Sequence, residues 1–105
     1  MNKNNLVHNV FITLKDSSDA VIKNLIEECY TYLKDHPGIV YFSAGCLVPE
    51  NNRDVNITDY HVGLHVVFSD KSYHDSYQVS EKHLIFVDRN KNNWEKVRVF
   101  DTYVK

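Results

Sequence analysis

The sequence has 105 residues, a length that suits a single domain spanning residues 1–105. Its net charge is −2 and it carries no basic stripe, so we do not expect a nucleic-acid partner. The polar N-terminal residues lack the apolar segment of a signal peptide, and no apolar run approaches membrane-spanning length. We therefore expect a cytoplasmic protein without membrane contact, in which Cys29 and Cys46 are free thiols and small buried side chains.

The first half of the chain predicts a strand, a helix and a second strand. Residues 6–15 alternate with apolar side chains on both faces, which is typical of a strand that is covered on both sides. A helix is expected from about Ser18 to Asp35, because apolar residues recur there at helical spacing and His36-Pro37-Gly38 follows. His36 is expected at the surface near the helix end. Residues 39–48 predict the second strand, and the polar residues 49–56 predict a loop.

The second half predicts a strand over residues 59–70, a broken helix to about residue 91, and a last strand over residues 94–104. The order strand, helix, strand, strand, helix, strand is that of an α+β, ferredoxin-like βαββαβ domain with a four-stranded antiparallel sheet and both helices on one face. The other face of the sheet keeps apolar residues such as Phe11 and Val67. We therefore expect two sheets to pack face to face in a homodimer.

The helical stretch of residues 73–86 is predicted to break near Ser80. Tyr77 and His83 are six residues apart, and at about 100° per residue they would point to different sides of one straight helix. Ser80 is a suitable N-cap for a new helix that starts at Glu81. Such a break would turn Tyr77 and His83 toward one pocket between the sheet and the helices.

In this order and spacing, the chain resembles the stress-responsive A/B-barrel (Dabb) family of dimeric α/β-barrel proteins. The resemblance covers nearly the whole chain and rests on five features: His8 to Lys15, Pro37-Gly38-Ile39, Tyr60 to Phe68, Tyr77 with His83, and Trp94 to Tyr103. It implies a homodimer that two sheets close into a barrel. Many members of the family have no defined role.

One enzymatic branch of the family resembles olivetolic acid cyclase, which closes a linear polyketide by aldol condensation. The resemblance places the pocket residues of that branch on Tyr77, His83 and His8. A third-strand histidine of the cyclase falls on Val62, and the His-Pro common between the tyrosine and the histidine is Ser80-Glu81 here.

Two functions follow as alternatives. The first is a protein that binds a small apolar or aromatic molecule in the pocket, with His8, Val62, Tyr73 and Phe86 as ligand-binding residues. The second is a cofactor-free cyclase or lyase, in which His83 removes a proton next to a carbonyl and the Tyr77 hydroxyl stabilises the resulting oxyanion. In a purely structural interpretation, His83 is a helix histidine with satisfied hydrogen bonds, Tyr77 is a wall residue of an amphipathic helix, and His8 is a capped residue at the start of its strand.

No metal or cofactor is expected from the sequence. His61 and His65 are predicted to share one strand face, but roughly 13 Å apart along the strand, which is too far to bind one ion together. His74 is expected to be a surface histidine. A haem-degrading role is a further alternative, because related ferredoxin-like dimers have it. Trp94 at the start of the last strand is expected away from the pocket, which counts against this role.

Overall fold

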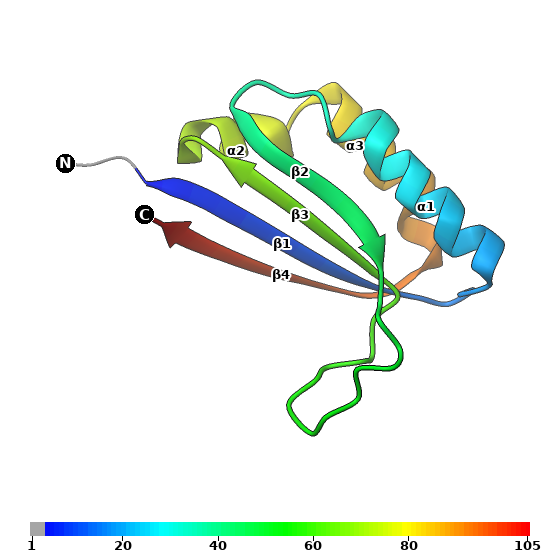
Figure 1. Cartoon of the computed structure of the whole chain (residues 1–105). Coiled ribbons are helices and arrows are strands. Elements are labelled where there is room, and N and C mark those ends of the chain that lie inside the picture. The colour runs from blue at the N-terminus through cyan, green and yellow to red at the C-terminus, as the bar shows by residue number, and fades with distance from the viewer. Residues whose placement is uncertain (1–3) are drawn as a thin grey trace.

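The computed structural model describes residues 4–105 and consists of one antiparallel sheet and three α-helices. The strands are β1 (Asn5–Leu14), β2 (Ile39–Cys46), β3 (Val62–Phe68) and β4 (Trp94–Val104), in the order β2-β3-β1-β4. The helices are α1 (Asp19–Tyr32), α2 (Lys71–Gln78) and α3 (Glu81–Asn90), and a short 3-10 helix, η1 (Lys91–Asn93), precedes β4. The predicted ferredoxin-like α+β fold is confirmed (Figure 1).

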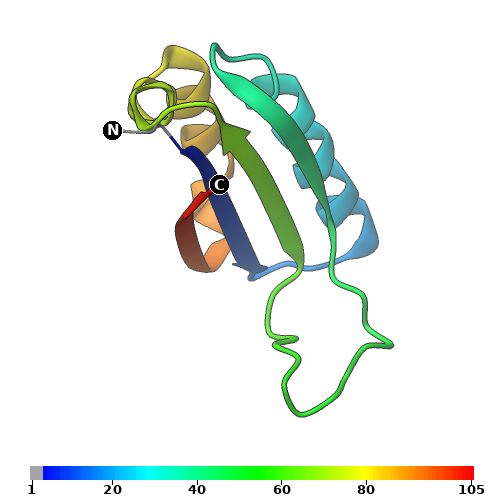
Figure 2. The same cartoon turned by 60° about the vertical axis from the view of Figure 1, so that its left-hand side comes forward.

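All three α-helices lie against the same face of the sheet, as Figures 1 and 2 show. The core lies in this layer. Alternate residues of β1 and β3 point into it, and they pack on Leu25, Cys29 and Leu33 from the α1 segment and on Tyr77 and Phe86 from the two later helices. The helix α1 ends earlier than predicted, at Tyr32, where the His36 Nε2–H donates a hydrogen bond of 2.8 Å to the Tyr32 carbonyl. His36 is therefore half-buried rather than a plain surface residue.

The predicted helix break is present and lies at Ser80. The helix α2 ends at Gln78 and α3 begins at Glu81. Ser80 has extended backbone angles, and its side-chain oxygen accepts a hydrogen bond from the His83 backbone N–H at 3.2 Å, as an N-cap does. The cap fixes the direction of the α3 axis relative to α2 and so the position of His83.

The turn before β2 depends on Gly38, the one described residue with a positive φ angle, +82°. The Tyr73 side chain of α2 packs directly over this glycine. A Cβ atom at position 38 would lie 2.0 Å from Tyr73 Cγ, so no larger residue fits. Gly38 and Tyr73 thus join the start of β2 to α2.

Strand β3 is shorter than predicted, because the chain bends before Val62 and His61 lies outside the strand. The His61 Nδ1 accepts a hydrogen bond from the Leu14 backbone N–H at 3.0 Å, and its ring lines a groove with residues of α1. His65 lies instead on the opposite face of the sheet, where its Nδ1–H donates to Asn9 Oδ1 at 2.7 Å. The prediction that His61 and His65 share a face was wrong.

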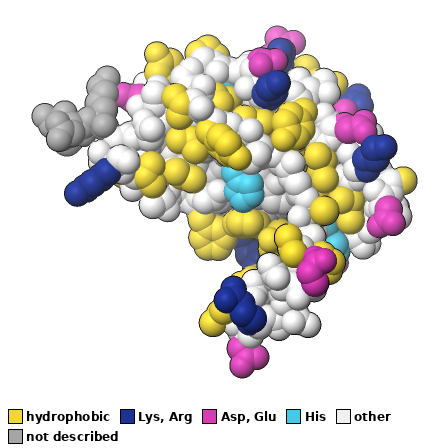
Figure 3. Space-filling view, in the orientation of Figure 1, with side chains coloured by type: hydrophobic (Ala, Val, Ile, Leu, Met, Phe, Trp, Pro, Cys, Tyr) yellow, Lys and Arg dark blue, Asp and Glu magenta, His cyan; other side chains and the backbone are white. Residues whose placement is uncertain are grey.

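The face of the sheet opposite the helices is uncovered in this chain. It carries Phe11, whose ring contacts those of Tyr60, His65 and Phe100 at 4.9 to 5.9 Å. Tyr41 and Phe100 are each 55% exposed here. Figure 3 shows hydrophobic side chains gathered over the sheet and most charged side chains toward the edges.

Two further findings concern the cysteines and the helices. Cys29 is buried as expected, whereas Cys46 is exposed because it is the last residue of the edge strand β2. Within residues 4–105, no helix has the length and hydropathy needed to cross a membrane.

Candidate functional site

A cavity of about 140 Å³ lies between the sheet and the helices. Apolar side chains of β1, β4 and α3 make up most of its wall. Polar side-chain atoms come from His8, Tyr77, Gln78, His83 and Trp94, whose buried Nε1 has no hydrogen-bond partner among the described residues. The lining residues are His8, Val10, Ile12, Leu33, Leu64, Tyr77, Gln78, His83, Phe86, Val87, Trp94, Val97 and Val99. Val97 and Val99 are 41% and 48% exposed, so the cavity lies next to solvent along the edge strand β4.

Tyr77 and His83 meet at this cavity, as the helix break predicts. Their ring centroids are 4.8 Å apart in an edge-to-face arrangement. Among the described residues, neither the buried Tyr77 Oη nor the buried His83 Nδ1 has a hydrogen-bond partner. A buried polar atom without a partner costs about 1 to 3 kcal/mol, so both atoms can gain from a ligand or a water molecule.

Burial decides the protonation states of this pair. It lowers the pKa of His83 to about 4, with a smaller contribution from the neighbouring histidines His8, His36 and His74. It also raises the pKa of Tyr77 above its ordinary value. At neutral pH the imidazole is therefore neutral with one nitrogen able to accept a proton, and the phenol keeps its proton and can donate a hydrogen bond.

His8 enters the site from β1 and is 4% exposed. Its Nδ1 lies 2.6 Å from Asp101 Oδ1, because residues 8 and 101 are direct partners in the β1–β4 ladder. Burial lowers the pKa of His8, and the Asp101 carboxylate partly offsets this effect. A carboxylate accepts the hydrogen on Nδ1, which leaves the lone pair on Nε2 at the cavity side.

Of the predicted ligand-binding residues, His8 and Phe86 line the cavity, whereas Val62 and Tyr73 do not. Val62 is completely buried in the core of the sheet, between Ile12 and Cys46 of its neighbouring strands. Tyr73 is 42% exposed and lies over Gly38. Trp94 was expected away from the pocket, and this was wrong: it lines the cavity and its ring centroid lies 5.9 Å from that of Phe86.

The sequence interpretation missed Gln78, His74 and Asp101. His74 was expected at the surface, yet its side chain is 14% exposed and its ring centroid lies 4.9 Å from that of His8. One signal in the sequence could have placed two of them together: His74 and Gln78 are four residues apart on α2, so they share a face of the helix. The nearness of Asp101 to His8 depends on the strand register, which the sequence alone does not give.

Comparison with known proteins identifies the family of the chain. The sequence profile of the stress responsive A/B barrel domain (Dabb) matches residues 6–104. A search of the curated proteins found no match.

Three solved structures illustrate the likeness in fold. A Dabb family protein with a ferredoxin-like fold from Mesorhizobium loti is 24% identical, with a TM-score of 0.80 over 98% of this chain and 99% of the other. A dimeric ferredoxin-like protein of unknown function from Thermobifida fusca is 10% identical, with a TM-score of 0.80 over 99% and 94%. The hydroxynitrile lyase from Passiflora edulis is 16% identical, with a TM-score of 0.77 over 99% and 96%. Because the family profile matches almost the whole chain, this chain belongs to the stress responsive A/B barrel domain family.

Proposed function

We propose that the protein is a homodimer that binds a small apolar or aromatic molecule in the cavity between the sheet and the helices. The observation that carries this proposal is the pair of unpartnered polar atoms, Tyr77 Oη and His83 Nδ1, on residues that line an otherwise mostly apolar cavity. Such a wall favours an apolar body with one oxygen-containing group. That group would accept a hydrogen bond from Tyr77, donate one to His83, or do both.

The size of the cavity limits the ligand. An engineered apolar cavity of about 150 Å³ takes up one benzene molecule, and this cavity measures about 140 Å³. A ligand that stays inside would therefore have about the size of a single ring, such as a phenol or a cyclic enone. A longer molecule would have to extend past Val97 and Val99 at the edge of the sheet.

The binding proposal is tested by titrating the protein with phenol, a small cyclic ketone and cyclohexane, followed by NMR shifts and by thermal unfolding. We expect phenol to bind more tightly than cyclohexane, and Tyr77→Phe or His83→Leu to reduce this preference. Tyr103→Phe is the matched control, because it also removes one tyrosine hydroxyl but from a side chain that is 58% exposed on β4. Equal binding of phenol and cyclohexane, or equal effects of Tyr77→Phe and Tyr103→Phe, would refute the proposed anchors.

A second candidate function is cofactor-free proton transfer, as in a lyase or cyclase. The specific observation in its favour is the protonation pattern: a neutral His83 within ring contact of a protonated Tyr77. His83 would take a proton next to a carbonyl, and Tyr77 would donate a hydrogen bond to the oxyanion that forms. A pKa of about 4 makes His83 a weak base at neutral pH, which is why binding is the first proposal.

The two functions are separated by one variant. If His83→Ala keeps its affinity for a small 1,3-diketone or cyanohydrin but loses turnover, the enzyme proposal is supported. If the wild-type protein turns over none of these compounds while it binds them, the binding proposal holds. The hydroxynitrile lyase from Passiflora edulis, which shares the fold, makes cyanohydrins a reasonable first set of substrates.

The homodimer proposal rests on the uncovered face of the sheet. Its aromatic cluster of Phe11, Tyr60 and Phe100 is only partly buried in one chain, and the Thermobifida fusca protein of the same fold is dimeric. Two such faces packed together would close a barrel and remove this apolar surface from water. Sedimentation of the wild-type protein at micromolar concentration tests this directly, and a monomer would contradict it.

A further inference from the structure

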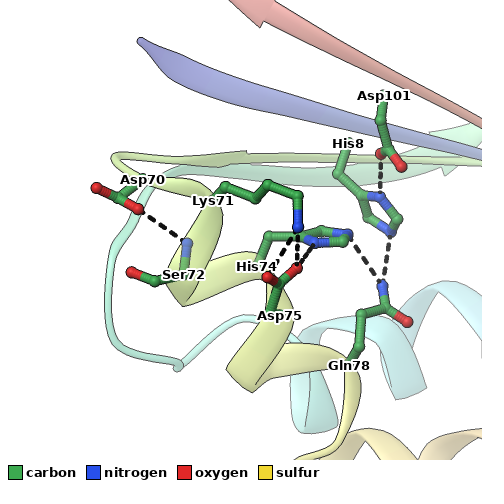
Figure 4. A network of polar contacts seen from close by, with 8 residues as sticks. All are labelled: His8, Asp70, Lys71, Ser72, His74, Asp75, Gln78 and Asp101. Carbon is green, nitrogen blue, oxygen red and sulfur yellow. Dashed lines mark hydrogen bonds and ion pairs between the residues drawn. The ribbon is translucent and has the colours of Figure 1, made fainter. Parts of the chain in front are cut away.

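At one end of the cavity wall, two histidines from different elements are each held by a carboxylate in the same way. His8 of β1 has its Nδ1 2.6 Å from Asp101, and His74 of α2 has its Nδ1 3.0 Å from Asp75 (Figure 4). In both pairs the carboxylate accepts the hydrogen on Nδ1. The tautomer is thereby fixed in both rings, and each Nε2 carries a lone pair.

The two Nε2 atoms converge on one point. Each lies 3.4 Å from the Gln78 side-chain nitrogen, which dashed lines join to both rings in Figure 4. This distance is longer than the roughly 3.2 Å at which N–H donors normally bind. The Gln78 amide is thus a weak partner for two lone pairs that are aimed at the same place.

A carboxylate behind an imidazole whose other nitrogen is free is the arrangement that metal-binding histidines in proteins usually have. We propose that His8 Nε2 and His74 Nε2 bind a divalent transition-metal ion of the zinc type, with the Gln78 side-chain oxygen as a third ligand. Asp101 and Asp75 orient the two imidazoles. Rotating the Gln78 amide by half a turn exchanges its nitrogen for its oxygen and so turns a donor into a ligand atom.

The spacing fits this proposal after a small closure. A ring nitrogen of His8 and one of His74 lie within 4.8 Å of each other, and an Asp101 oxygen lies within the same distance of both. Bonds of about 2.0 to 2.1 Å place neighbouring ligand atoms roughly 3.3 Å apart. Gln78 and His74 lie four residues apart on α2, so the closure would take place between one face of this helix and His8 of β1.

Charge and access also fit a cation. Lys71 pairs with Asp75 at 2.8 Å, whereas Asp101 has the His8 ring as its partner. Both carboxylates therefore lie behind the imidazoles, on the side away from the two Nε2 atoms. The side chains of Asp101 and His74 are 42% and 14% exposed, so the cluster lies next to solvent.

This inference is independent of the proposed small-molecule ligand and of any enzymatic turnover. It is tested on the full chain, without a histidine tag and after treatment with a chelator, by titration with Zn²⁺ in a calorimeter and with Co²⁺ in a visible spectrophotometer. We expect one ion per chain with micromolar affinity or better. Bound Co²⁺ should give the absorption bands of a site with nitrogen ligands.

Three variants test the residues. His74→Ala, at a partly exposed helix position, should remove specific Zn²⁺ binding, and Asp101→Asn should weaken it by about tenfold to hundredfold, as loss of an orienting carboxylate does. His65→Ala is the matched control, because His65 also pairs through Nδ1 but lies on the opposite face of the sheet. Thermal unfolding without metal verifies that each variant is folded. The proposal is overturned if the wild-type protein binds neither ion, or if His74→Ala binds as the wild type does.

Discussion

The contact between Gly38 and Tyr73 gives a stability prediction whose size follows from the structure. Gly38→Ala would place a residue with a Cβ atom at φ +82°, where an L-residue costs about 1 to 2 kcal/mol. The new Cβ would also lie 2.0 Å from Tyr73 Cγ, and relieving such overpacking costs typically about 1 to 3 kcal/mol. We therefore expect the free energy of unfolding to fall by about 2 to 5 kcal/mol, a large share of the total for a domain of this size.

The two contributions are separated by a double-mutant cycle measured by urea unfolding. Tyr73→Gly is the suitable partner, because the Tyr73 Cβ itself would lie 2.5 Å from the new atom and an alanine would keep it. In the Tyr73→Gly background, Gly38→Ala should cost only the backbone contribution. Coupling below about 0.5 kcal/mol would show that the two residues act independently. A loss of less than about 0.5 kcal/mol for Gly38→Ala alone would refute both parts of the reasoning.

Three further predictions concern the cap, the pH dependence and the dimer. Ser80→Ala should lower the free energy of unfolding by about 1 kcal/mol, whereas Ser18→Ala should cost much less, because the Ser18 side chain makes no capping hydrogen bond; equal losses in urea unfolding would contradict this. Burial lowers the pKa of His83 from 6.5 to about 4, so the unfolded chain binds more protons between these values. The contribution of His83 to the free energy of unfolding should be fully present above pH 6.5 and fall as the pH drops toward 4, by about 1 to 2 kcal/mol at pH 5 once solvent screening is included. In His83→Leu, the free energy of unfolding should depend less steeply on pH across that range. An unchanged pH dependence would argue against the assignment to His83. Phe100→Asp should shift the protein toward a monomer in sedimentation experiments, and an unchanged mass would exclude this face of the sheet as the interface.

The fold was predictable because its signals are local. Alternating strands, an amphipathic helix and the Ser80 cap each follow from neighbouring residues, and together they give the observed element order. The boundaries were less accurate. The bend before Val62 comes from hydrogen bonds that His61 makes with Ile12, Leu14 and Leu47, which are distant in sequence.

The site was predictable only in part. The pairing of Tyr77 with His83 depends on one cap and was anticipated, and its role in binding or catalysis stays a prediction. The contacts of His8 with Asp101 and of Phe86 with Trp94 depend on the strand register and on how α3 packs against the sheet. Neither is encoded in residue spacing, so Trp94 was placed away from the cavity and Asp101 was overlooked. The cytoplasmic location also stays a prediction.

The break at Ser80 has a consequence for motion. Because of this break, one side of the cavity is formed by two short helices, of 8 and 10 residues, instead of one long helix. Helices this short do not persist in water without tertiary packing. The strands β1 and β3 are instead held by ladders along their whole length. We expect amide hydrogens of α2 and α3 to exchange with solvent faster than those of β1, through opening events smaller than global unfolding. The same openings would let a molecule enter the cavity from the side that α2 and α3 form.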